Sequence, residues 1–213
     1  MWESALMKKS RLNEKAIVIT FIFVGFVLFG LLGFNVYNDF IKDDSVKVKE
    51  LDKIDLFGYV LDEYDTKIYR KYFNELNKVL SSEEINYEEY AKLLSKLFVI
   101  DFYTLSNKVS STDIGGLEFV YNDLLDNFKL NAGDTIYKYV ESNIDGKRKQ
   151  ELPEVSDVIV NSVFDTKYTY DKKEYDSYIV DVNWTYKKDL GYQDKMKLNI
   201  IKDGTELYVV SGE

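Results

Sequence analysis

The chain has 213 residues, a net charge of −9, and neither cysteine nor histidine. This composition excludes disulfides and thiolate metal sites, and it removes both the usual general base near neutral pH and the usual metal ligand. The acidic balance also disfavours nucleic acid as a partner, because phosphates are bound by Lys and Arg.

The first feature along the chain is an uncharged apolar segment over residues 16–37, AIVITFIFVGFVLFGLLGFNVY. A helix of these 22 residues would span about 33 Å, which matches a membrane hydrocarbon thickness of about 30 Å. A cleaved signal peptide is the alternative, but its apolar region is usually shorter, and residues 35–39 contain no small-x-small cleavage site. We therefore expect an uncleaved signal anchor that crosses a membrane once.

Basic residues indicate the orientation of this anchor. Residues 1–37 carry a net charge of +2, with every basic residue before the apolar segment, and the rest of the chain carries −11. The positive-inside rule places such a tail in the cytoplasm. The predicted organisation is a cytoplasmic tail over 1–15, a transmembrane helix over 16–37, a stalk over 38–50 and an extracytoplasmic domain over 51–213.

The first half of this domain has helical periodicity. Residues 51–60 predict a short strand or an irregular entry, and Asp65 and Thr66 cap a helix that ends near Leu80. Asn86 and Glu89 form a capping box for a second helix, expected at the centre of the core because it contains a stretch that is apolar on every face. A third helix is predicted over 117–128 and a short fourth one over 134–140.

Apolar residues alternate in the second half, which indicates strands. Four strands are expected around residues 158–168, 178–186, 196–200 and 207–209, with turns at 171–174, 189–192 and 203–204. Short connections make neighbouring strands antiparallel, and the last strand would leave an open edge at 207–210. The predicted fold class is α+β, with about four helices packed on one face of a four-stranded antiparallel meander sheet.

This order of elements resembles the NTF2-like α+β cone. With a short tail and a single span before it, the layout is similar to VirB8-type proteins of secretion and conjugation systems and to their Gram-positive relatives. The stretches LFVIDFYTLSNK, GGLEFVYNDLLDNFKL and DTIYKYVESN also resemble a group of uncharacterised single-pass membrane proteins of low-GC Gram-positive bacteria. The resemblance implies an NTF2-like fold and a class of host, and it implies no activity.

Candidate site residues are few, and no catalytic residue, cofactor or metal site is expected. Asp101 lies in the otherwise apolar run LFVIDFYTL, so it is either hydrogen-bonded in the core or lines a pocket. A row of aromatic residues on the expected strands either belongs to the core or lines the mouth of the cone. This row consists of Tyr168, Tyr178, Trp184 and Tyr186.

Other polar motifs favour structural interpretations. Asp113 to Gly116 places two glycines before a helix, which suits an anion cradle or, more simply, a helix-start loop. The paired carboxylates at 83–84 and 88–89 lie at helix starts, where the helix dipole favours acids.

Two functional hypotheses remain. The first is a membrane-anchored extracytoplasmic protein-interaction domain, in an envelope, secretion or conjugation assembly, with a protein partner or self-association and no nucleic acid. The alternative is a tethered sensor or carrier that binds a small apolar ligand in the cone. A deep pocket reaching Asp101 would favour the carrier, whereas a filled cone with an exposed apolar patch would favour the assembly. Neither hypothesis is an enzyme, because few nucleophile–base pairs can be built from this composition.

Overall fold

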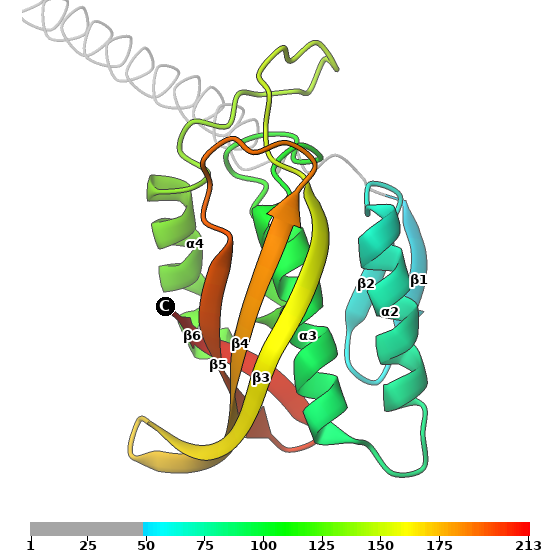
Figure 1. Cartoon of the computed structure of the whole chain (residues 1–213), viewed down its shortest axis with the longest axis vertical. Coiled ribbons are helices and arrows are strands. Elements are labelled where there is room, and N and C mark those ends of the chain that lie inside the picture. The colour runs from blue at the N-terminus through cyan, green and yellow to red at the C-terminus, as the bar shows by residue number, and fades with distance from the viewer. Residues whose placement is uncertain (1–48) are drawn as a thin grey trace, which may run out of the picture. The chain divides into compact units, whose positions relative to one another are not determined.

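A computed structural model describes residues 49–213 (Figure 1). The chain forms a short β-hairpin, two long helices, an irregular segment with a third helix, and a four-stranded antiparallel sheet. The elements are β1 (Glu50–Ile54), β2 (Tyr59–Asp62), α2 (Lys67–Leu80), α3 (Tyr87–Tyr103), the 3-10 turns η1 (Leu117–Phe119) and η2 (Asn122–Leu124), α4 (Leu125–Asp134), β3 (Val155–Tyr170), β4 (Lys173–Tyr186), β5 (Lys195–Asp203) and β6 (Glu206–Gly212).

The two long helices begin where the sequence predicts. The Thr66 side chain accepts a hydrogen bond from the backbone N–H of Tyr69 at 3.3 Å, and Asn86 accepts one from Glu89 at 3.1 Å. Each bond satisfies an N–H group that has no partner within its helix. These caps confirm the predicted starts of α2 and α3.

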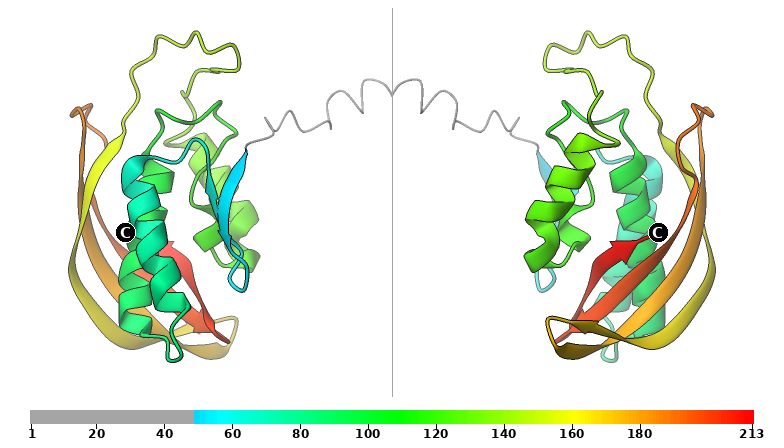
Figure 2. Two further views of the ribbon diagram at one scale, coloured as in Figure 1. Left: turned by 90° about the vertical axis from the view of Figure 1, so that its right-hand side faces the viewer. Right: turned by 90° about the vertical axis from the view of Figure 1, so that its left-hand side faces the viewer.

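Helix α3 is the centre of the core. Leu97, Val99 and Ile100 are at most 1% exposed, although they lie on different faces of the helix. Figure 2 shows why: α3 lies between the four-stranded sheet and a second layer made by β1–β2 and α4. The predicted central position of this helix is confirmed.

The sheet is a meander in the order β3-β4-β5-β6, with every pair antiparallel. Asp171 and Lys172 connect β3 to β4 in a two-residue turn, both with positive φ, which matches the twist of the strands. Gly204, with φ 65°, closes the turn between β5 and β6. One face packs on α3 through buried side chains of all four strands, among them Val158, Val180, Val182, Leu198, Ile200 and Val209.

The predicted fold class was wrong in the number of helices and in placing all strands in one sheet. Residues 49–213 contain three α-helices rather than about four, and β1 and β2 form a separate two-stranded sheet. The expected helix over 117–128 is broken because Val120 is extended and bridges Val209 of β6. The expected helix over 134–140 is a series of turns, since the chain leaves helical geometry at Thr135 (φ −119°, ψ −100°).

The predicted transmembrane helix over 16–37 lies outside the described residues, as do the tail and most of the stalk. Across residues 49–213, every helix is too short or too polar to cross a membrane. The fold-class prediction, in which a transmembrane helix precedes an NTF2-like domain of four helices on one sheet, is therefore corrected to a three-helix, two-sheet α+β domain.

Candidate functional site

An apolar groove of about 460 Å³ lies beside α4. Its walls come from the last turns of α3, from η2 and α4, and from β5 and β6. The lining residues are Phe98, Phe102, Tyr103, Val120, Leu124, Asn127, Phe128, Asn131, Gln193, Met196, Leu198 and Val209 to Glu213. We call this hollow the α4 groove.

The groove exists because α4 packs loosely against the rest of the domain. Ala132 is the only residue of this ten-residue helix that is buried, and the helix starts without a side-chain cap. An aromatic cluster holds it in place, with the Phe128 ring centroid 5.1 Å from that of Phe102 and 6.0 Å from that of Phe98. The groove therefore has an aromatic floor and a weakly anchored wall.

The opposite wall is the last part of β6. Near Val209 the outer edge of this strand is covered, because Val120 bridges Val209 and the Tyr121 N–H donates to the Val209 carbonyl at 3.1 Å. Beyond that point Ser211 and Gly212 pair with β5 on one side and line the groove on the other. The edge that was predicted to be open is thus covered at Val209 and lines the groove beyond it.

Gly212 allows close packing in the groove wall. A Cβ atom at this position would lie 2.8 Å from Cε of Met196 and 3.3 Å from Cδ2 of Leu198. The glycine therefore lets these two side chains lie flat against the strand. The result is an apolar surface directly beside a backbone edge.

Three of the polar side chains that line the groove are carboxamides. Asn127 and Asn131 lie one turn apart on α4, and Gln193 lies across from them before β5. The Tyr103 hydroxyl donates to Oε1 of Gln193 at 3.1 Å. Glu213 is the only lining residue with a charged side chain at neutral pH, so the groove suits an uncharged ligand with amide or hydroxyl groups.

A second hollow of about 470 Å³ continues beyond the Tyr103–Gln193 hydrogen bond. It shares Phe102, Tyr103 and Gln193 with the α4 groove and is otherwise lined by the turns after α4 and the loop before β5. The two hollows therefore adjoin at these three residues.

Trp184 and Tyr186, two members of the predicted aromatic row, contact residues that line these two hollows. Trp184 is 2% exposed and its ring centroid lies 4.5 Å from that of Tyr103. The Tyr186 hydroxyl donates to the Gln193 carbonyl at 2.5 Å, and burial raises the pKa of Tyr186 to about 12. Both side chains support groove residues without lining the groove.

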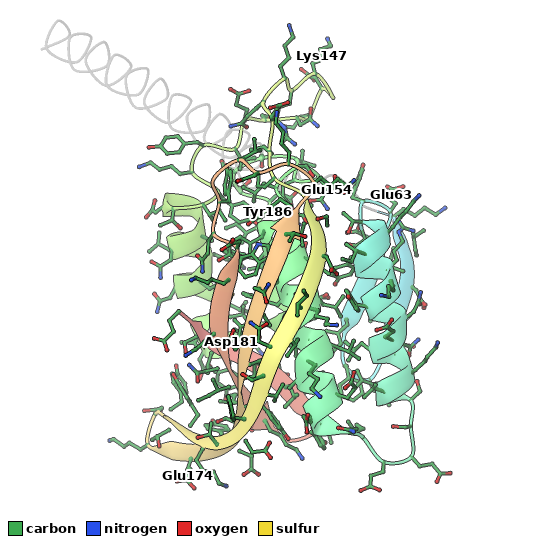
Figure 3. All side chains as sticks on the ribbon, in the orientation of Figure 1. Glu63, Lys147, Glu154, Glu174, Asp181 and Tyr186 are labelled. Carbon is green, nitrogen blue, oxygen red and sulfur yellow. The ribbon has the colours of Figure 1, made fainter. Side chains whose placement is uncertain are left out.

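Tyr168 and Tyr178 lie elsewhere on the sheet. Tyr168 pairs with Tyr175 near the tip of the β3–β4 hairpin, while Tyr178 is half-buried and pairs with Asp165 and Ile200. Figure 3 labels Glu174, at this tip, and Tyr186, at the opposite end of β4. The row therefore does not converge on one pocket.

Asp101 is not part of the groove lining either, although it precedes the lining residue Phe102. Its carboxylate pairs with the ammonium group of Lys108 and accepts the Gly116 N–H at 2.5 Å. Burial alone would lower the pKa of Lys108, but the charge of Asp101 raises it above its ordinary value. Asp101 thus joins the end of α3 to the following loop, which matches the structural alternative considered from the sequence.

Two partly buried acids, neither of them predicted as a site residue, lie near this pair. Glu118 accepts the Tyr69 hydroxyl at 2.6 Å and the Val60 N–H at 3.0 Å, while Asp65 accepts the Asp62 N–H at 2.7 Å. Burial raises the pKa of Glu118 to about 7 and that of Asp65 to about 7. The available signal for Glu118 was an isolated acid in the apolar run GGLEFVY.

These acids connect elements rather than form a metal centre. Within residues 49–213 no group of three or more acidic side chains is placed to hold a metal ion. The Asp113–Gly116 loop likewise uses its polar groups internally, since Asp113 accepts the Val109 N–H at 2.8 Å and Gly116 donates to Asp101. It is therefore occupied by protein contacts and offers no anion cradle.

The chain matches no protein-family model, no curated protein and no solved structure.

Proposed function

We propose that this protein is a membrane-tethered binding domain that holds an extended segment of a partner protein in the α4 groove. The observation that carries the proposal is the end of β6, Val210 to Glu213, which lines the groove beside apolar walls. An exposed strand end can accept another chain through backbone hydrogen bonds, while neighbouring pockets select its side chains. Here Phe128 and Met196 would contact alternate side chains of the guest.

The rim and the rest of the domain support a polypeptide guest. Carboxamides at Asn127, Asn131 and Gln193 can donate to and accept from backbone amides without a charge requirement. The core between α3 and the sheet is packed at its centre, where Leu97 and Val180 are fully buried, and Phe164 is 62% exposed on the sheet. A filled interior with exposed apolar residues favours interaction over storage of a ligand in the core.

Membrane attachment belongs to the proposal and rests on the sequence of residues 16–37 and on the basic tail before them. The domain is proposed to act outside the cytoplasm, as a component of an envelope, secretion or conjugation assembly. We propose binding rather than catalysis because the groove lining offers one carboxylate and no activated nucleophile.

A peptide-binding experiment tests this function. The probes are a fluorescent peptide of alternating Val and Ser residues and the same peptide N-methylated at alternate residues. The full chain in nanodiscs should bind the first and not the second, because N-methylation removes the donors that pair with a strand edge. Binding should weaken in Asn131→Arg, at the groove rim, and persist in Asp126→Arg, which alters the same helix outside the lining. Equal binding of both peptides would contradict the proposal.

The second candidate is a carrier of a small apolar ligand, and the aromatic, nearly uncharged lining of the groove favours it. Native mass spectrometry of the protein purified from its membrane distinguishes the two. A co-purifying neutral lipid that is lost in Asn131→Arg, with no peptide binding, would replace the first proposal by the second.

A further inference from the structure

The segment Ser162–Tyr170, at the end of β3, is a regular strand edge with a strand partner on one side only. β3 forms one margin of the sheet, and its pairing with β4 shifts between Val160 and Ser162. From Ser162 to the turn the pairing is continuous, ending at Tyr170 opposite Lys173. Within residues 49–213, this segment pairs with β4 along one edge, and no strand pairs with its other edge. Figure 2 shows no described helix over the outer face of the sheet.

The sequence of this segment, SVFDTKYTY, is complementary to itself when two copies run antiparallel about Thr166. In that register Asp165 of each copy faces Lys167 of the other, and Phe164 faces Tyr168. Thr166 faces its own counterpart. Opposite charges, aromatic pairs and Thr–Thr pairs are the cross-strand neighbours that stabilise antiparallel strands.

Three of the side chains that this register would bring together are exposed, while Thr166 and Tyr168 are half-buried. Phe164 is 62% exposed, and the Lys167 side chain is 59% exposed although it also pairs with Asp176 of β4. Asp165 is exposed as well. Charged residues on an edge strand normally prevent indiscriminate pairing, but in an antiparallel copy of this segment each charge would meet its opposite.

We infer that Ser162–Tyr170 pairs with the same segment of a second copy, about a twofold axis at Thr166, so that two four-stranded sheets join into one. The contact is isologous, as expected of a closed dimer. The shift near Asn161 ends the pairing on one side, because an irregular strand cannot continue a regular ladder. This contact does not involve the α4 groove, so the result of its test does not depend on the proposed function.

Disulfide trapping tests the register, because the natural chain has no cysteine. In the paired dimer the two Thr166 Cα atoms would be roughly 4.5–5.5 Å apart, within reach of a disulfide. The full-length T166C variant in nanodiscs should therefore form a covalent dimer under mild oxidation. The matched control T205C, in the exposed β5–β6 turn, should stay monomeric. Equal crosslinking of both variants, or none of T166C, would overturn the inference.

Charge reversal then tests the pairing itself. In the T166C background, Asp165→Lys or Lys167→Glu places like charges opposite each other at both symmetric contacts, and each should reduce the covalent dimer roughly tenfold. Mixing these two variants restores both attractions, so a heterodimer should form at the original yield. Asn131→Arg should leave crosslinking unchanged. An unchanged yield of covalent dimer in the charge-reversal variants would show that the crosslink arises from random collisions rather than from strand pairing.

Discussion

Glu118 illustrates how one side chain can connect three parts of the domain. Its carboxylate accepts hydrogen bonds from Tyr69 of α2 and from Val60 of β2, while its own backbone belongs to η1. Burial makes the neutral form of this carboxyl favourable near pH 7. Asp65, close by, is affected in the same direction.

The raised pKa values predict that the domain is more stable in mildly acidic than in mildly basic solution. The folded pKa of Glu118 lies above its value of 4.5 in the unfolded chain, so its contribution is complete below pH 4.5 and is lost as pH rises through about 7. Urea unfolding at pH 5.5 and 7.5 should differ by about 1–2 kcal/mol. Glu118→Gln should reduce that difference, because the amide stays neutral and can donate to a reoriented Tyr69 hydroxyl. An unchanged pH dependence would mean that Glu118 titrates normally.

Gly115 is a second position where one residue determines the local path of the chain. A Cβ atom there would lie 2.3 Å from the carbonyl oxygen of Asp101 and 2.7 Å from its Oδ1. The chain can therefore pass this close to α3 only as glycine. Its N–H also donates to the Tyr137 hydroxyl at 3.0 Å, which in turn donates to the Phe102 carbonyl at 2.7 Å.

Gly115→Ala should accordingly destabilise the domain by roughly 2–4 kcal/mol, because the backbone must move and break these buried hydrogen bonds. Gly133→Ala is the matched control, since its Cβ would meet nothing within 4 Å and it lies in α4. That change should be neutral or stabilise by about 0.5–1 kcal/mol. Thermal unfolding of the two variants measures both effects, and similar melting temperatures would contradict the close contact.

At the scale of elements, local signals were sufficient for α2, α3 and the meander. The side chains of Thr66 and Asn86 each cap a helix by accepting a hydrogen bond from the N–H three residues later. The alternation of apolar residues in the strands arises because one face of the sheet is buried. Residues 117–140 were mispredicted because their conformation depends on distant groups. Val120 has helical spacing in the sequence, yet its bridge to Val209 holds it extended.

The α4 groove could not be predicted for the same reason. The position of the groove depends on how closely α4 packs against α3 and the sheet, which the sequence does not specify. Helical periodicity places Asn127 and Asn131 on a polar face and does not indicate that they line a groove. Asp101 was correctly recognised as unusual, but its partner Lys108 lies in a loop whose path the sequence does not specify. The short β1–β2 sheet was expected only as a strand or an irregular entry, although Gly58, with φ 72°, provides its turn.

For the whole molecule, the proposed placement makes a simple topological prediction. If the tail is cytoplasmic and residues 16–37 cross the membrane, protease added to intact spheroplasts should digest the domain over 49–213. Digestion should not require lysis of the spheroplasts, because no membrane would lie between the protease and the domain. A domain that is protected in intact spheroplasts and digested only after lysis would reverse the orientation.

The β1–β2 hairpin also has a mechanical consequence, because it is the first described element after the proposed anchor. Four of the five residues of β1 are exposed, and only Ile54 is buried, whereas β2 is held by Tyr59 and by the bond from Val60 to Glu118. A pull on residue 49 would open the hairpin from its free end, one hydrogen bond at a time. β1 would therefore lengthen the tether by roughly 15 Å before the core felt any force. With force applied between residues 49 and 213 in optical tweezers, a small reversible extension should precede unfolding, at a lower force in Ile54→Ala. A single abrupt rupture in both proteins would mean that the hairpin and core yield together.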